Sequence, residues 1–161
     1  MTDEHRLPRG AGSYLLLLRL GRAATLRVGR LGEVAFRRGW YAYIGSALGA
    51  GGLRARIGHH CRVADRPHWH IDYLRRAARL DTVWYVQDPR RWECAWAQVL
   101  AQWPGVSTPL VGFGASDCQC PAHLFCLPQR PTRGALETAM RAAFPDHPAF
   151  RSLRPRSCPA S

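Results

Sequence analysis

The sequence contains no lysine and no asparagine, so all 23 basic residues are arginine. A GC-rich genome produces this bias without any functional demand, and the arginine count alone therefore says little. The bias does not explain the charge, because exchanging lysine for arginine leaves the excess of base over acid unchanged. With 11 acidic residues, the formal net charge is +12. A field of that sign attracts polyanions, so nucleic acid is the first partner class we expect.

Long hydrophobic runs are also missing. The leucine run at 15–18 is closed by Arg19 and Arg22, far short of the roughly 20 apolar residues that a membrane helix needs. Residues 1–9 are polar, and no charged-then-apolar leader with a small-residue cleavage site is present. We therefore expect a cytoplasmic protein that makes no contact with a membrane.

Six cysteines are present, and in a cytoplasmic chain they are expected to be reduced thiols or metal ligands rather than a disulfide framework. Cys118, Cys120 and His123 have a ligand-like spacing, although two cysteines one residue apart are a tight fit for tetrahedral zinc. Three residues could supply a fourth ligand: Cys94, Cys126 and Asp117. The alternative is that the cluster consists of small packed thiols and a histidine that orders a loop.

The length of 161 residues fits one domain of ordinary size. Apolar and β-branched runs predict strands at 12–20, 24–28, 34–36, 40–46, 82–87 and 123–127. Helical patterns fall at 53–61, after Pro67, at 90–103 and at 131–144. This order predicts an α/β (α+β) fold, a small central antiparallel sheet flanked by helices. We expect one domain over residues 10–144, with flexible tails at 1–9 and 145–161.

Three tyrosines stand out in the predicted strands. Because side chains alternate along a strand, Tyr41 and Tyr43 share one face. If the first strand pairs with the strand at 40–46, Tyr14 would come to lie beside Tyr43. Tyrosines in a small sheet are also ordinary core residues, so this arrangement alone does not establish a site.

Several motifs in order carry a family resemblance. The chain has GSY at 12–14, YIG at 43–45, an LRAR segment ending at Arg56, His60 four residues later, and Glu93 on a following helix. This series resembles the GIY-YIG nuclease superfamily. The stretches HWHIDYL at 68–74 and GFGASDCQCPAHLF at 112–125 are similar to a little-characterised branch, the Uri-type endonucleases, found alone or fused to endonuclease III type repair enzymes.

The resemblance implies metal-assisted hydrolysis of a phosphodiester bond. Tyr14 would be the general base, with Tyr43 in the same hydrogen-bond network. Arg56 and His60 would handle the phosphate and its protons. Glu93 would bind a single Mg²⁺ or Mn²⁺ ion. A phenol with a pKa near 10 is a weak base at neutral pH, so this assignment requires positive charge close to Tyr14.

Neighbouring residues are candidates for substrate contact: Arg54, His68 and His70. A structural role, such as helix capping or a satisfied buried imidazole, is the competing interpretation for His68 and His70. His59 is expected to face solvent. The chain departs from the family pattern at Ser13, where an apolar residue is usual, and in lacking a downstream asparagine.

These observations favour a metal-dependent endonuclease acting in DNA repair or processing, on DNA rather than RNA and without a small-molecule cofactor. Two alternatives remain. One is a basic nucleic-acid-binding module without catalysis, in which Trp40, Trp69 and the arginines would stack on bases and contact phosphates. The other is a zinc-stabilised scaffold.

Overall fold

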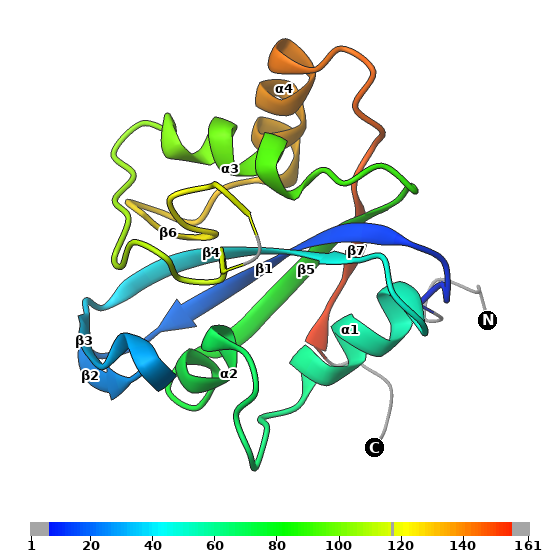
Figure 1. The fold of residues 1–161 in the computed structure, drawn as a ribbon. Helices are drawn as coiled ribbons and strands as arrows, with labels where there is room; N and C mark the ends of the chain where they lie inside the picture. Colours follow the sequence, from blue (N-terminus) through cyan, green and yellow to red (C-terminus); the bar gives the residue numbers. More distant parts are fainter. Residues whose placement is uncertain (1–6, 117, 156–161) are drawn as a thin grey trace.

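Seven strands and four α-helices make up the part of the chain that the computed structural model describes, residues 7–116 and 118–155 (Figure 1). The strands are β1 (Gly12–Leu20), β2 (Ala24–Arg27), β3 (Glu33–Phe36), β4 (Gly39–Ala47), β5 (Arg79–Gln87), β6 (Leu124–Leu127) and β7 (Arg151–Leu153). The helices are α1 (Gly52–Cys61), α2 (His70–Arg75), α3 (Glu93–Ala101) and α4 (Arg133–Ala143). No helix among the described residues combines the length and the apolar composition needed to cross a bilayer.

Five strands form one antiparallel sheet in the order β6-β4-β1-β5-β7, and β2 pairs with β3 in a separate hairpin. β1 lies at the centre because its leucine run at 15–18 is apolar on both faces and fully buried. The predicted α/β class with a small antiparallel sheet is therefore confirmed.

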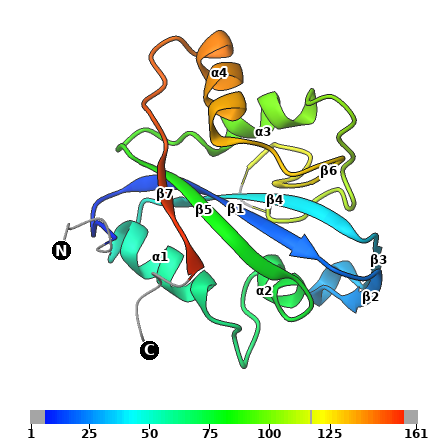
Figure 2. The same ribbon diagram turned by 180° about the vertical axis from the view of Figure 1, so that it is seen from behind.

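Helices cover both faces of this sheet (Figures 1 and 2). On one face, α1, α2 and the β2–β3 hairpin enclose a core that contains Leu16, Ile57 and Leu74. On the other face, α3 and α4 pack through Trp96 and Met140 onto the alternate side chains of the strands. Successive residues of β1 and β4 thus enter different cores, as the strand period requires.

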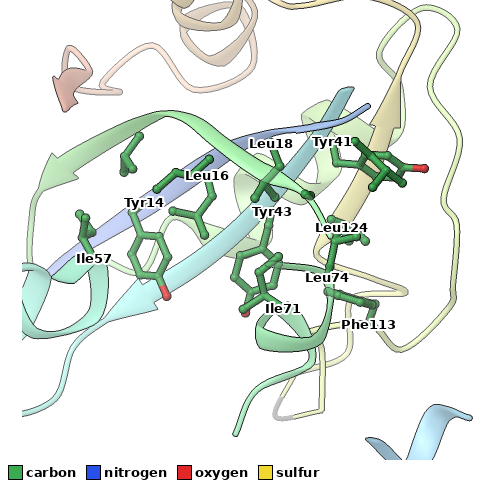
Figure 3. Close-up of a cluster of buried hydrophobic side chains, with 14 of the residues drawn as sticks. Tyr14, Leu16, Leu18, Tyr41, Tyr43, Ile57, Ile71, Leu74, Phe113 and Leu124 are labelled. Atoms are coloured by element: carbon green, nitrogen blue, oxygen red, sulfur yellow. The ribbon is translucent and has the colours of Figure 1, made fainter. Parts of the chain in front are cut away.

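The strand register confirms the predicted neighbourhood of the tyrosines. Tyr14 lies opposite Gly45, and Tyr43 lies opposite Leu16, so the two tyrosines are diagonal neighbours on adjacent strands. Figure 3 shows that both rings project from the same face of the sheet and carry their hydroxyl groups to the same side.

The segment after α4 is ordered, in contrast to the flexible tail expected from 145 onward. β7 pairs with β5, and Phe150 is buried against the α3 face of the sheet. The buried His147 accepts a hydrogen bond from the Trp96 indole N–H at 2.8 Å. The prediction is therefore wrong for residues 145–155, because apolar residues spaced through the proline-rich segment supply enough buried surface to fix it.

The N-terminal tail also differs from the expectation where it is described. Leu7 is buried in the core beside α1. The carbonyl of Pro8 accepts the backbone N–H of Arg54 at 2.9 Å, which satisfies one of the free donors at the start of α1.

Candidate active site

A cavity of about 340 Å³ lies at the end of the sheet where β1 begins and β4 ends. It collects side chains from β1, β4, α1, the segment before α2, the start of α3 and the loop after residue 112. The lining residues include six predicted from the sequence: Tyr14, Tyr43, Arg56, His68, His70 and Glu93. Trp69, Arg91, Gly45, Ser46, Gly114 and Ser116 complete most of the wall.

Tyr14 packs directly over the glycine of the YIG motif. A Cβ atom at Gly45 would overlap the phenol ring, so only glycine leaves room for Tyr14 at this register. The Tyr14 hydroxyl is hydrogen-bonded to Nε2 of His60 at 2.8 Å, and both side chains are almost fully buried. The two motifs therefore depend on each other sterically, and α1 supplies the imidazole behind the phenol.

Burial controls the protonation of this pair. It raises the pKa of Tyr14 well above its usual value, and the nearby Tyr43 raises it further, while Arg56 acts in the opposite direction. Burial likewise lowers the pKa of His60 to about 3, assisted by His59. At neutral pH the ligand-free site therefore contains a neutral phenol bonded to a neutral imidazole.

Arg56 projects from α1 into the cavity, and its guanidinium lies 4.6 Å from the centre of the Trp69 ring. Contact with an aromatic face holds the planar cation in place beside Tyr14, and a guanidinium has several N–H groups with which it can contact an anion. Arg54 is exposed and is not among the cavity-lining residues, so of the two candidate arginines Arg56 lies at the site.

Glu93 is the first residue of α3, and only 5% of it is exposed. Its Oε1 lies 3.0 Å from Nε of Arg91, and its Oε2 lies 3.8 Å from Nδ1 of His123. The start of α3 is fixed to β1 because the Trp92 N–H donates to Oγ of the fully buried Ser13 at 3.1 Å. The polar residue that departs from the family pattern thus positions the glutamate.

His70 orders the loop that closes the cavity. Its Nδ1 accepts the backbone N–H of Gly114 at 2.9 Å, and desolvation lowers the pKa of the ring. Gly114 has a φ of +70°, and a Cβ there would lie 2.8 Å from a ring carbon of Tyr43. A side chain at this position would therefore be strained and would collide with the site.

Asp72 fixes the segment that carries Trp69. Its Oδ2 accepts the backbone N–H groups of His68 and Trp69 at 2.9 and 3.0 Å, and its Oδ1 lies 2.9 Å from Nε2 of His59. Burial alone would raise the pKa of Asp72, but these hydrogen bonds outweigh it and lower the pKa. The expectation that His59 faces solvent is wrong, because it is bonded to this carboxylate and partly covered.

A second polar cluster lies behind Glu93. The ligand atoms of Cys94, Cys118, Cys120 and His123 all lie within 4.8 Å of one another. Of the three candidates for a fourth member, Cys94 is the one the structure places here. Asp117 lies outside the described residues.

Two other cysteines differ from this cluster. Cys126 points to the opposite face of the sheet, where its sulfur lies near Gly39 and Tyr41. Cys61 is disulfide-bonded, so the expectation of reduced thiols or metal ligands is wrong for that residue.

In a comparison with known families, residues 13–144 match the model of DUF123, a domain of unknown function. The chain belongs to the DUF123 family. No curated protein and no solved structure matches it. The matched segment contains every cavity-lining residue named above and the whole cysteine and histidine cluster, so the site belongs to this DUF123 domain and not to a flanking segment.

Sequence reasoning missed several contributors to the site of this DUF123 domain, among them Arg91 and Gly114. Arg91 faces Glu93 across 3.0 Å, and Gly114 brings the closing loop to Tyr43. Arg91 could have been suspected from the sequence, because it stands two residues before Glu93, the predicted metal ligand. Gly114 gave no local signal, because its contact spans 71 positions of the chain and appears only in the folded structure.

Proposed function

We propose that this DUF123 domain is a metal-dependent endonuclease of the GIY-YIG type that hydrolyses phosphodiester bonds in DNA, in repair or processing. The observation that supports the proposal is the presence of Tyr14, Tyr43, Arg56 and Glu93, from four separate elements, in the wall of one cavity. The formal net charge of +12 favours a polyanionic substrate.

Arg56 is suited to bind the scissile phosphate. Its planar guanidinium can donate two parallel hydrogen bonds to phosphate oxygens, and the Trp69 ring limits its motion. Placed beside the non-bridging oxygens, it would stabilise the negative charge that grows as the attacking oxygen adds to phosphorus.

Tyr14 and His60 provide a route for the proton of the attacking water. Tyr14 would accept that proton while its own passes along the 2.8 Å hydrogen bond to Nε2 of His60. In this assignment Nε2 is the unprotonated nitrogen of the neutral ring. The negative charge of the bound phosphate would have to offset the burial that keeps His60 neutral, because Arg56 lowers the pKa of that imidazole further, so the relay would operate with substrate in place.

Glu93 is the residue that would hold the divalent ion implied by the resemblance. It is the only carboxylate among the described residues that line the cavity, a donor set that fits one hydrated Mg²⁺ or Mn²⁺ rather than a two-metal centre. Arg91 bonds to Oε1 of Glu93 and holds the carboxylate that would bind the ion. When bound, such an ion would supply positive charge to the phosphate and the leaving oxygen.

The test is incubation of the purified protein with single-stranded, nicked, branched and supercoiled DNA in Mg²⁺ or Mn²⁺. We expect cleavage that Glu93→Gln removes and that Tyr14→Phe lowers by about 10²–10⁴-fold. Glu33→Gln, which changes an exposed glutamate on β3, is the matched control and should cleave like the unmodified protein. No cleavage of any substrate, or equal cleavage by Glu93→Gln, would refute the proposal.

A second candidate, a nucleic-acid-binding module without catalysis, is favoured by one observation. The pKa of Tyr14 is raised by burial, which opposes the phenolate that a base requires. Salt-dependent DNA binding without turnover under any metal condition would support this candidate.

A further inference from the structure

Cys94, Cys118, Cys120 and His123 form a group that the proposed hydrolysis does not use. Cys94 is the second residue of α3, and the other three come from the loop that precedes β6. Their four ligand atoms lie within 4.8 Å of one another, and the Cys118 sulfur is 3.3 Å from Nε2 of His123. Two segments that are 24 positions apart in the chain, counted from Cys94 to Cys118, thus bring together the donor atoms of one compact cluster.

The chemistry of these donors selects a class of metal. Three thiols and one imidazole without a carboxylate are soft ligands, which suit zinc and exclude Mg²⁺ and Ca²⁺. Tetrahedral zinc with metal–sulfur bonds of about 2.3 Å places neighbouring sulfur atoms about 3.8 Å apart. The observed cluster is within a small inward movement of that geometry. We propose that these four residues bind one structural zinc ion.

Two backbone hydrogen bonds fix the position of His123 in the structure. Its N–H donates to the carbonyl of Phe113 at 2.8 Å, and its carbonyl accepts the N–H of Ile44 on β4 at 2.9 Å. The imidazole is fully buried. The ligand is therefore oriented by the sheet before any metal binds, which reduces the ordering that binding must bring about.

Glu93 connects this zinc site to the candidate active site. Nε2 of His123 faces the thiol of Cys118, while Nδ1 on the opposite side of the ring lies 3.8 Å from Oε2 of Glu93. A carboxylate behind a metal-bound imidazole fixes the tautomer and the orientation of the ring. Zinc would thus clamp the start of α3 to the loop that carries Gly114 and Ser116 into the cavity wall.

A second group of possible ligands, His59, His60 and Asp72, is a weaker candidate. Both oxygens of Asp72 already accept hydrogen bonds from His59 and from two backbone N–H groups, and Nε2 of His60 is bonded to Tyr14. The carboxylate and imidazole donors of this group are used by hydrogen bonds to other parts of the protein, whereas the three thiols of the first group lie against one another and against His123.

The test is elemental analysis of the full chain, purified without a metal-chelating tag under reducing conditions. We expect about one zinc ion per chain. Protein stripped by a chelator and given Co²⁺ should show the visible bands and sulfur-to-metal charge transfer of tetrahedral thiolate coordination. Binding should release the thiol protons, which a weakly buffered solution would record. This Co²⁺ titration uses the unmodified chain, so it remains informative if a variant fails to fold.

Substitutions locate the metal. Cys118→Ala and Cys120→Ala should each lose the zinc, while Cys126→Ala, a cysteine on the other face of the sheet, should retain it. Equal zinc content in all three variants, no zinc in the unmodified protein, or a disulfide among the three thiols under reducing conditions would overturn the proposal.

Competition with a chelator tests the link to Glu93. We expect Glu93→Gln to weaken zinc binding by about 10–100-fold, and an unchanged affinity would refute the link. Zinc content is measured without DNA, so a failure of the nuclease proposal and a failure of the zinc proposal would be distinguishable.

Discussion

His60 makes the stability of the protein depend on pH in a way that one substitution can isolate. The imidazole is 1% exposed, and burial holds its pKa at about 3, against about 6.5 for an unperturbed histidine. The unfolded chain therefore takes up a proton as the pH falls through 6.5, and the folded protein does not. The contribution of the neutral His60 to the unfolding free energy is therefore fully present above pH 6.5, and it is lost progressively between pH 6.5 and pH 3.

The size of this loss follows from the difference in pKa. At pH 4.5, two pH units below the pKa of an unperturbed histidine, proton binding at His60 favours the unfolded state by about 3 kcal/mol. Asp72 and Asp88, whose pKa values are lowered in the folded protein, add their own loss mainly below pH 4. The interval from pH 7 to pH 4.5 therefore reports histidines rather than these carboxylates.

The assay is urea unfolding at pH 7 and pH 4.5 for the unmodified protein and for His60→Gln. We expect the drop in unfolding free energy between the two pH values to be smaller in His60→Gln by about 3 kcal/mol. The lowered pKa values of His70 and His147 contribute to both proteins and cancel in the comparison. His68→Gln, at an exposed imidazole, should behave like the unmodified protein. An identical drop in His60→Gln would show that His60 is not held neutral by burial.

Three further predictions concern glycine positions, the buried hydrogen bond of Ser13 and the binding of DNA. Gly45→Ala should displace the phenol of Tyr14, and DNA cleavage assays should show that cleavage is abolished. Gly58→Ala changes a glycine on α1 where a new Cβ atom would meet nothing within 4 Å. This variant should raise the unfolding free energy by about 0.5–1 kcal/mol. Ser13→Ala leaves the buried N–H of Trp92 without its acceptor, so urea unfolding should show a loss of about 1–3 kcal/mol. The affinity for DNA should fall steeply with added salt, as filter binding at several ionic strengths would measure, and a salt-independent affinity would contradict a phosphate-contacting role.

Much of the fold could be predicted because its signals are local. The leucine run of β1 is apolar on both sides, and the structure begins and ends this strand at the predicted residues, Gly12 and Leu20. The alternation of tyrosines in β4 gave the face of Tyr43 without knowledge of the rest of the molecule. Local periodicity was sufficient here because strand geometry leaves only two choices of face.

The errors fall where distant residues decide the outcome. The segment after α4 has the composition of a tail, but Phe150 is fixed by α3 and by a hydrogen bond from its N–H to Glu137. Sequence spacing left Cys94, Cys126 and Asp117 open as the fourth cluster member, and only the folded chain brings the first of these to the others. From the sequence, Ser13 is only a departure from a motif. The folded structure shows that its hydroxyl accepts the backbone N–H of Trp92 at the start of α3.

The pairing of β7 with β5 has a practical consequence for any shortened version of the protein. β7 covers the outer side of β5 at Val83–Tyr85, where the Thr82 hydroxyl also donates to the carbonyl of Leu153. Ending the chain after α4 would leave that hydrogen-bonding edge bare next to a freshly exposed apolar surface. Two molecules would then join edge to edge, so insolubility of such a fragment would reflect the uncovered strand edge and not a defect in the candidate active site.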